Sequence, residues 1–118
     1  MSLKREVKKS FEIADGEHTG TIVSVEVREE PYAYIEPMVK VDGFDELNMK
    51  YSCPDSLSQN SKLGKLLVAF GAEIDEGEEV DIEEILLGRK VKFMTQKIKG
   101  KGGREFSEII VGTLKPAN

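Results

Sequence analysis

Several residue types that build catalytic, metal or membrane sites are scarce in this chain. Its 118 residues include one cysteine, one histidine and no tryptophan. A single cysteine excludes an internal disulfide and a zinc site built from cysteines, and it favours a reducing compartment, the cytoplasm. No apolar run approaches the ~20 residues of a membrane-spanning helix, and no segment resembles a signal peptide. We therefore expect a cytoplasmic protein that does not contact a membrane.

Catalytic and metal-binding signatures are also missing. His18 and Cys53 lie far apart in the sequence, and no motif pairs them as base and nucleophile. The glycines at 100–103 lack the spacing and the Lys-Ser/Thr pair of a phosphate-binding P-loop. The acidic run at 75–81 lacks the alternating ligands of a calcium loop. The sequence therefore predicts a non-enzymatic protein with no metal and no cofactor.

Charge is abundant and strongly segregated along the chain. The net charge is −5, which by itself argues against a nucleic-acid partner. Residues 73–84, however, contain eight acids and no base, whereas residues 89–104 contain seven bases and no acid. A chain divided in this way can present one basic surface while it is acidic overall. The alternative is a solvated acidic loop followed by an ordinary lysine-rich hairpin.

Apolar periodicity predicts five strands, with one helix between the third and the fourth. The strands are expected at residues 19–29, 32–41, 47–51, 91–96 and 106–114, and the helix at 61–70. Four apolar side chains form one stripe along the helix: Leu63, Leu66, Leu67 and Phe70. Ser61 can cap the N-terminus of this helix. A shorter helical turn is predicted at 81–88, where Asp81 and Glu84 have the spacing of a capping box.

Two of the strands carry features that predict how they lie in a sheet. In the first, Val23, Val25 and Val27 alternate with polar residues, which is typical of a half-buried strand. In the second, Pro37 lacks the N–H that a strand ladder needs. We therefore expect the second strand to lie at an edge or to carry a bulge.

The order of these elements predicts the fold class. Three strands, a helix and two further strands form the layout of an OB-fold, a small Greek-key barrel. We expect residues 16–118 to form one mainly β domain of this kind, a five-stranded barrel, after a loosely ordered basic segment at 1–15. Barrels of this type bind oligonucleotides or oligosaccharides through strands 2–3 and two flanking loops. The layout thus favours a binding function.

The loop between the last two strands is the first candidate site. Its flexible glycines are surrounded by four cations suited to a phosphate chain: Lys97, Lys99, Lys101 and Arg104. In OB-folds this loop is one of the two that close over the ligand. The alternative is a hairpin that ends in glycine and lysine for solubility and to block edge pairing.

The predicted second and third strands supply the second candidate site. Single-stranded bases stack on aromatic rings, and Tyr34 shares a strand face with Met38 and Lys40. Lys50 and Tyr51 add a cation and an aromatic ring on the third strand. Phe106 ranks behind the three tyrosines as a further aromatic candidate for exposure. For Tyr51, a half-buried ring with its hydroxyl in water is an equal alternative. Together the two sites predict sequence-tolerant binding of single-stranded nucleic acid, with DNA as the expected ligand.

Three short motifs resemble those of small phage- and prophage-encoded OB-fold proteins. They are SKLGKLL at 61–67, FG at 70–71 and LGRKV at 87–91. Proteins of this kind belong to replication and recombination functions and are regarded as single-stranded-DNA-binding or binding-like. The resemblance implies a basic loop on the four cations above and a binding sheet on Tyr34, Met38, Lys40 and Lys50. The last residues of the chain, however, are not the acidic tail of bacterial single-stranded-DNA-binding proteins.

The alternative function is a protein-interaction or assembly module that uses the barrel as a scaffold. Its interface would include the acidic segment 73–84. The positions of the basic side chains in the folded structure distinguish the two functions. A basic face shared with Tyr34 favours nucleic acid, and acids interleaved among the bases favour assembly. The sequence leaves open whether the chain forms homo-oligomers and whether the ligand is DNA or RNA.

Overall fold

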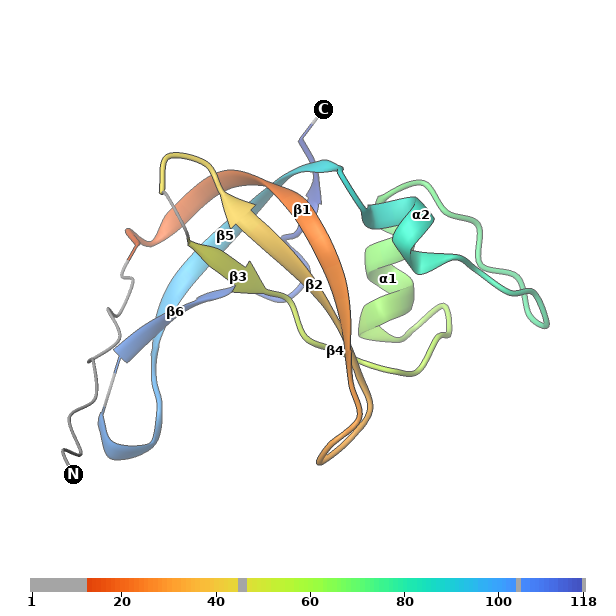
Figure 1. Ribbon diagram of the computed structural model, residues 1–118, viewed down its shortest axis with the longest axis horizontal. Coiled ribbons are helices and arrows are strands. Elements are labelled where there is room, and N and C mark those ends of the chain that lie inside the picture. The colour runs from red at the N-terminus through yellow and green to blue at the C-terminus, as the bar shows by residue number, and fades with distance from the viewer. Residues whose placement is uncertain (1–12, 45–46, 104, 118) are drawn as a thin grey trace, which may run out of the picture.

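One antiparallel sheet and two short helices make up residues 13–44, 47–103 and 105–117, which the computed structural model describes (Figure 1). The strands of this part are β1 (Gly16–Arg28), β2 (Tyr34–Val41), β3 (Asn48–Lys50), β4 (Cys53–Pro54), β5 (Lys90–Lys99), β6 (Glu105–Ile109) and β7 (Lys115–Pro116). The helices are α1 (Lys62–Ala69) and α2 (Ile82–Leu86), and a 3₁₀ turn, Lys101–Gly103, joins β5 to β6. The mainly β class predicted from the sequence is confirmed.

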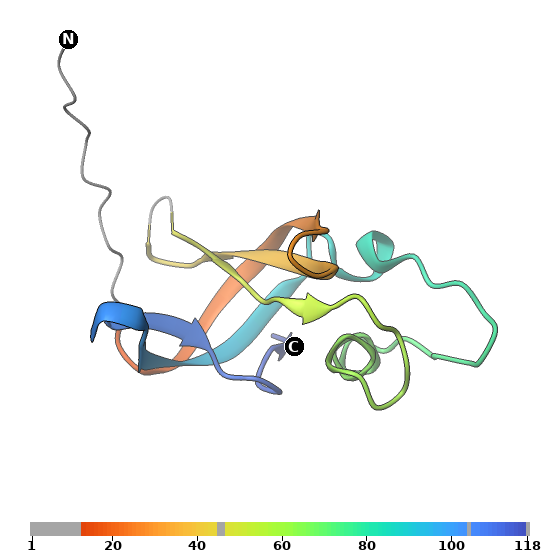
Figure 2. The same cartoon turned by 90° about the horizontal axis from the view of Figure 1, so that it is seen from below.

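The strands follow the order β3-β2-β1-β5-β6 across the sheet, while β4 pairs with β2 and β7 pairs with β5. The predicted sequence of strands and helix is present, with β4 and β7 as additional short strands. Both helices lie at one end of the sheet, and the β5–β6 turn lies at the other (Figures 1 and 2). In the described ranges, neither helix is long and apolar enough to cross a membrane.

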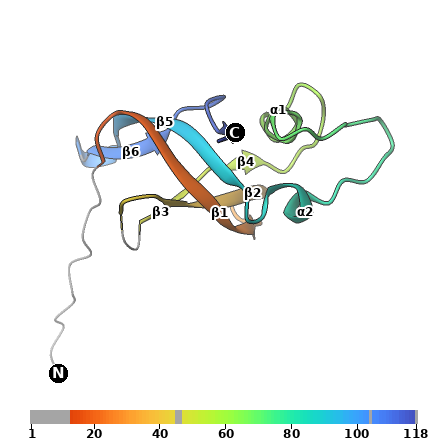
Figure 3. The same ribbon diagram turned by 90° about the horizontal axis from the view of Figure 1, so that it is seen from above.

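The sheet coils so that its two edge strands, β3 and β6, face each other (Figure 3). Their Cα atoms come within 8 Å of one another. Within the described residues, however, no ladder of hydrogen bonds joins the two strands, so the sheet is not closed there. This opening positions the candidate site.

A bulge in β1 changes how its valines lie. The register with β2 shifts directly after Ile22, and Val23 is the extra residue and is exposed. Beyond the bulge, Val25 packs against the core, as the alternation predicts. Val27 lies opposite Ile35 and faces the same side, yet it is 62% exposed. The expected half-burial is therefore wrong for Val23 and Val27, because periodicity reveals neither a bulge nor where the core ends.

Pro37 lies inside the sheet and not at an edge. β2 runs between β1 on one side and β3 and β4 on the other, so the expected edge position is wrong. The alternative, a bulge, is found on the partner strand at Val23. The Pro37 carbonyl accepts a hydrogen bond from the Tyr51 N–H at 2.9 Å, where the partner of β2 changes from β3 to β4. Proline is tolerated here because the pairing on both sides is irregular nearby.

The predicted last strand is interrupted. β6 ends at Ile109 and β7 begins at Lys115, because a turn with Gly112 at φ +85° separates them. The Thr113 hydroxyl fastens this turn to β5 by accepting a hydrogen bond from the Met94 N–H at 3.1 Å. A continuous strand over 106–114 is therefore wrong. The break allows β5 to pair with β6 along one half and with β7 along the other.

Both helices begin as the sequence predicts, and α1 also packs as predicted. The Ser61 side chain accepts a hydrogen bond from the Gly64 N–H at 2.9 Å, and that of Asp81 accepts one from the Glu84 N–H at 3.1 Å. The predicted apolar stripe of α1 is buried: Leu63, Leu66, Leu67 and Phe70. This stripe packs in one core with the inner face of the sheet, which includes Ile22, Val39, Val91 and Phe93.

The described chain starts at Ile13, which is buried. The Ile13 carbonyl accepts a hydrogen bond from the Ser107 hydroxyl at 3.4 Å, which ties the segment before β1 to β6. Residues 1–12 of the predicted loose segment lie outside the described residues. The predicted division of the chain at residue 15 stays a prediction.

Gly64 offers a test of the packing around α1. Alanine is the better helix former by about 1 kcal/mol, but a Cβ at Gly64 would lie 1.7 Å from the Ser58 carbonyl oxygen. We expect Gly64→Ala to lower the free energy of unfolding by about 1–3 kcal/mol in urea denaturation, because backbone must move to admit the methyl group. Lys65→Ala, at the next and exposed position, should change it by less than about 0.5 kcal/mol. A Gly64→Ala chain more stable than the parent would contradict this packing.

Candidate nucleic-acid interface

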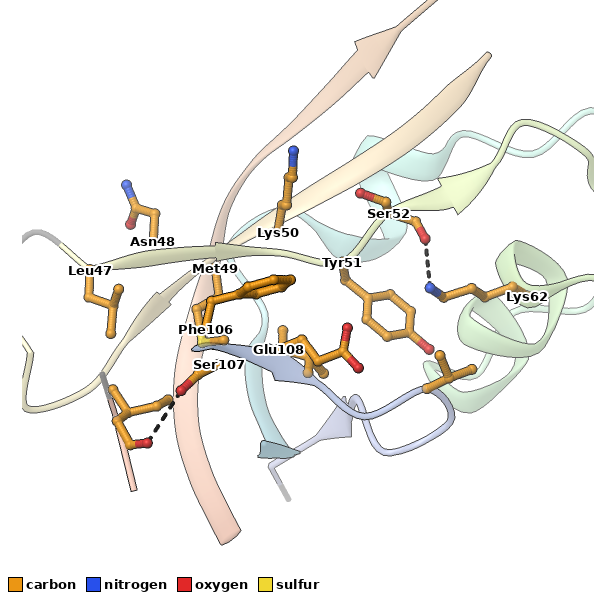
Figure 4. A pocket seen from close by; sticks show the side chains of 13 residues that line it. Leu47, Asn48, Met49, Lys50, Tyr51, Ser52, Lys62, Phe106, Ser107 and Glu108 are labelled. Carbon is orange, nitrogen blue, oxygen red and sulfur yellow. Dashed lines mark hydrogen bonds between the residues drawn. The ribbon is translucent and has the colours of Figure 1, made fainter. Parts of the chain in front are cut away.

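A groove of about 460 Å³ lies between the edge strands β3 and β6, where the sheet is open (Figure 4). Its apolar lining comes from both strands and includes Met49, Phe106 and Ile109. Lys50 and Lys62 line it on the side of β3 and α1. A concave, largely apolar site with a few polar groups is the usual form of a ligand site.

Phe106 is the exposed aromatic ring of this groove. It is 46% exposed and points from β6 toward β3 (Figure 4). In the ladder between β5 and β6 it lies opposite Ile98, so Lys97 and Lys99, the two neighbours of Ile98 in β5, point to the other face of this hairpin. The sequence placed Phe106 behind the three tyrosines as a stacking candidate. Its position directly after the glycine-rich loop was the available signal.

Tyr51 does not present its ring as expected. The side chain is 4% exposed, so the predicted exposure is wrong. Its hydroxyl accepts a hydrogen bond from the Gly112 N–H at 3.0 Å, and Lys62 Nζ lies 4.3 Å from the ring centroid. Burial raises the pKa of Tyr51, and the hydrogen bond from Gly112 partly offsets this. Tyr51 therefore links the two sides of the groove and is not an open platform.

The basic hairpin lies beside the groove. Lys97 and Lys99 are exposed at the end of β5, and Lys97 lies opposite Ser107, a lining residue. Lys101 begins the 3₁₀ turn, in which Gly102 and Gly103 have positive φ, and Arg104 lies outside the described residues. An acid is also present, because Glu105 lies opposite Lys99. The hairpin is therefore basic but not free of negative charge.

The outer face of β2 and β3 carries the other predicted residues. Tyr34, Met38 and Lys40 alternate with buried residues of β2, and Lys50 lies opposite Met38. The Arg28 guanidinium lies 4.5 Å from the centroid of the Tyr34 ring. One face of Tyr34 is therefore covered by a cation that the sequence analysis did not assign to the site.

Glu36 is the main residue that sequence reasoning missed. It lies on β2 between Tyr34 and Met38 and is 5% exposed. Its carboxylate lies 3.5 Å from Arg28 Nε and 3.8 Å from Lys50 Nζ, and it accepts a hydrogen bond from the Ser52 hydroxyl. The sequence places an acid at this position of the strand. Its burial depends on partners from three different segments.

The structure thus brings the predicted residues together in two groups. The lysines of the hairpin lie beside the groove that contains Phe106, whereas Tyr34 and Lys40 lie on the outer face. Lys50 belongs to both, since it lines the groove and pairs with Glu36. Acids are interleaved on the outer face, which is the arrangement expected of the alternative, assembly function. The groove and the hairpin are therefore the better candidate for a nucleic-acid site.

No metal centre accompanies this site in the part of the chain that the structure describes, where no group of three or more potential ligands gathers. A scan against protein-family models and a search of curated proteins find no match to the chain. The resemblance to phage OB-fold proteins therefore stays a prediction. The function has to be argued from the geometry.

Cys53 yields a prediction about pH. The thiol is fully buried on β4, and burial raises its pKa to about 11 from an ordinary value of 9.0, partly offset by the nearby Lys62. The neutral thiol therefore stabilises the folded chain below pH 9, and this contribution is lost as the pH rises toward about 11. In urea denaturation we expect the free energy of unfolding to fall by up to about 2 kcal/mol over this interval.

The matched variant is Cys53→Ala, which should lose less stability over the same interval, although Tyr51 still contributes in the same direction. Thiol reagents should label native Cys53 slowly at pH 8 and the urea-unfolded chain rapidly. Equal pH dependence of the two proteins, or rapid labelling of the native one, would show that the thiol is accessible and ordinary.

Proposed function

We propose that the chain binds single-stranded nucleic acid, with DNA as the expected ligand, along the groove between β3 and β6. The observation that carries this proposal is the position of Phe106. This half-exposed ring lies in a groove that Lys50 of β3 also lines, and the basic hairpin with Lys97 and Lys99 adjoins that groove. Stacking on an aromatic ring and charge on the backbone are the two requirements of sequence-tolerant single-strand binding.

The order of the strands supports the same proposal. An OB barrel opened between its third and fifth strands has the order seen here, if β5 and β6 are its last two strands and α1 is its helix. In that arrangement the β5–β6 turn is one of the loops that flank the ligand. The β1–β2 turn is the other, and it carries the exposed Tyr32. The five-stranded Greek-key barrel thus belongs to this proposal.

The cations of the hairpin determine the predicted salt dependence. Four phosphate contacts, from Lys97, Lys99, Lys101 and Arg104, imply a slope of log affinity against log salt of about −3. Fluorescence anisotropy of a labelled oligo-dT of about 30 nucleotides should show a roughly 50-fold loss between about 50 and 200 mM salt. A duplex of equal length should bind more weakly, because its bases are not free to stack.

Replacing Lys97 and Lys99 together with glutamine should weaken binding and reduce the slope by about 1.4, because two contacts are lost. Lys90 and Lys115 are exposed and lie away from the hairpin, at the start of β5 and on β7, so the same double replacement there is the matched control. No binding at tens of micromolar protein in low salt, or a flat salt response, would rule out the proposed function.

Phe106→Ala tests the stacking part separately. We expect a loss of about 1–3 kcal/mol in affinity for oligo-dT, which is roughly 5- to 150-fold, with the salt slope unchanged. Phe106→Trp should retain the affinity because it keeps an aromatic face. The control is Val111→Ala, an exposed apolar position that also lines the groove. If both alanine variants bind like the parent, Phe106 does not touch the bases.

A second groove gives the alternative function, a protein-interaction module, an observation of its own. It measures about 550 Å³ and lies between the β1–β2 hairpin and the residues that lead into α2. Its apolar lining includes the exposed Val27, and its acids are Glu79, Asp81 and Glu83. A basic, aliphatic segment of a partner protein would match this surface. This surface becomes the leading candidate if oligonucleotides fail to bind.

A further inference from the structure

The Glu36 carboxylate is surrounded as a bound anion would be. A hydroxyl donates to it from Ser52, and Arg28 Nε and Lys50 Nζ lie at 3.5 and 3.8 Å. Every ion pair found among the described residues involves this one carboxylate. The three partners come from β1, β3 and the segment before β4, so the fold assembles the site around β2.

The two cations are not saturated by this carboxylate. Both distances exceed the roughly 2.7–2.9 Å of a strong charge-assisted hydrogen bond, and Arg28 Nε has no hydrogen-bond partner in the described part of the chain. Both side chains also remain partly exposed, whereas the carboxylate is buried. The Arg28 Nε atom is itself buried, so a second anion can approach Lys50 and the exposed part of the Arg28 side chain from solvent. There it meets cations whose charge Glu36 already offsets in part.

The site adjoins the proposed nucleic-acid groove through Lys50, which lines that groove. We propose that the Glu36 carboxylate occupies an anion site formed by Arg28, Lys50 and Ser52, and that it competes with backbone phosphates for the two cations. This inference rests on the proposed function. Glu36 acts as an internal restraint on affinity, because nucleic acid gains the full charge of Arg28 and Lys50 only when the carboxylate is neutralised or displaced.

The test compares Glu36→Gln with Glu26→Gln. Glutamine has the shape of glutamate and keeps an oxygen that can accept the Ser52 hydrogen bond, so the fold should survive. Glu26 lies directly opposite Glu36 in the β1–β2 ladder and is exposed, so its replacement removes the same charge from the same region. For oligo-dT, Glu36→Gln should bind more tightly than the parent. Its salt slope should be more negative by about 0.7–1.4, which is one or two further phosphate contacts.

Glu26→Gln should leave the slope unchanged. Equal slopes for the two variants, or weaker binding by Glu36→Gln, would overturn the inference. If circular dichroism shows that Glu36→Gln does not fold, the salt slope of Lys50→Met, made in the parent chain, tests the inference instead. Its slope should change by clearly less than the ~0.7 expected for Lys97→Met, because Glu36 already occupies Lys50. An equal change would overturn the inference.

Tripolyphosphate separates this inference from the proposed function, because it has phosphates and no bases. In calorimetric titrations Glu36→Gln should bind it up to about fivefold more tightly than the parent, and Glu26→Gln should not. If the oligonucleotide fails to bind but this gain is seen, the proposed function fails and the anion site stands. If neither probe distinguishes Glu36→Gln from Glu26→Gln, the anion site fails.

Discussion

The hydrogen bond from the Gly112 N–H to the Tyr51 hydroxyl, at 3.0 Å, joins two sides of a sheet that is otherwise open. The edge strands β3 and β6 face each other here without a ladder between them, and unpaired edges are a liability unless they are covered or charged. Here Lys50 of β3 and Phe106 of β6 line the opening between the two edges. Because Tyr51 makes the link, its ring is buried, whereas the Phe106 ring in the same groove is half exposed.

Segregated charge along the chain becomes segregated charge in space. The acidic segment 73–84 leads into α2 at one end of the molecule, and the lysines of the β5–β6 hairpin lie at the other (Figure 1). The outer face between them is mixed, because Glu36 neutralises part of the charge of Arg28 and Lys50. Net charge alone therefore says little about where an anionic ligand can approach.

Part of the candidate site could be predicted from the sequence. The cations of the hairpin were visible as a run of bases with glycine, and a local pattern of this kind does not depend on distant residues. The burial of Tyr51 and of Glu36 was not visible, since the groups that cover them come from the turn at Gly112, from α1 and from β1. Phe106 was recognised as an aromatic residue but ranked too low, because its exposure depends on the open seam.

The sequence by itself determined the mainly β class, the order of the elements and the capped helix α1 with its apolar stripe. These follow from periodicity, caps and turn residues, which act over a few neighbouring positions. Tertiary structure alone decided the bulge at Val23 and the break at Gly112. It also decided that β2 lies inside the sheet and that β3 and β6 are not joined by a ladder in the described residues. Each of these features depends on how a strand pairs with strands that are distant in the chain. The local sequence pattern does not encode that pairing.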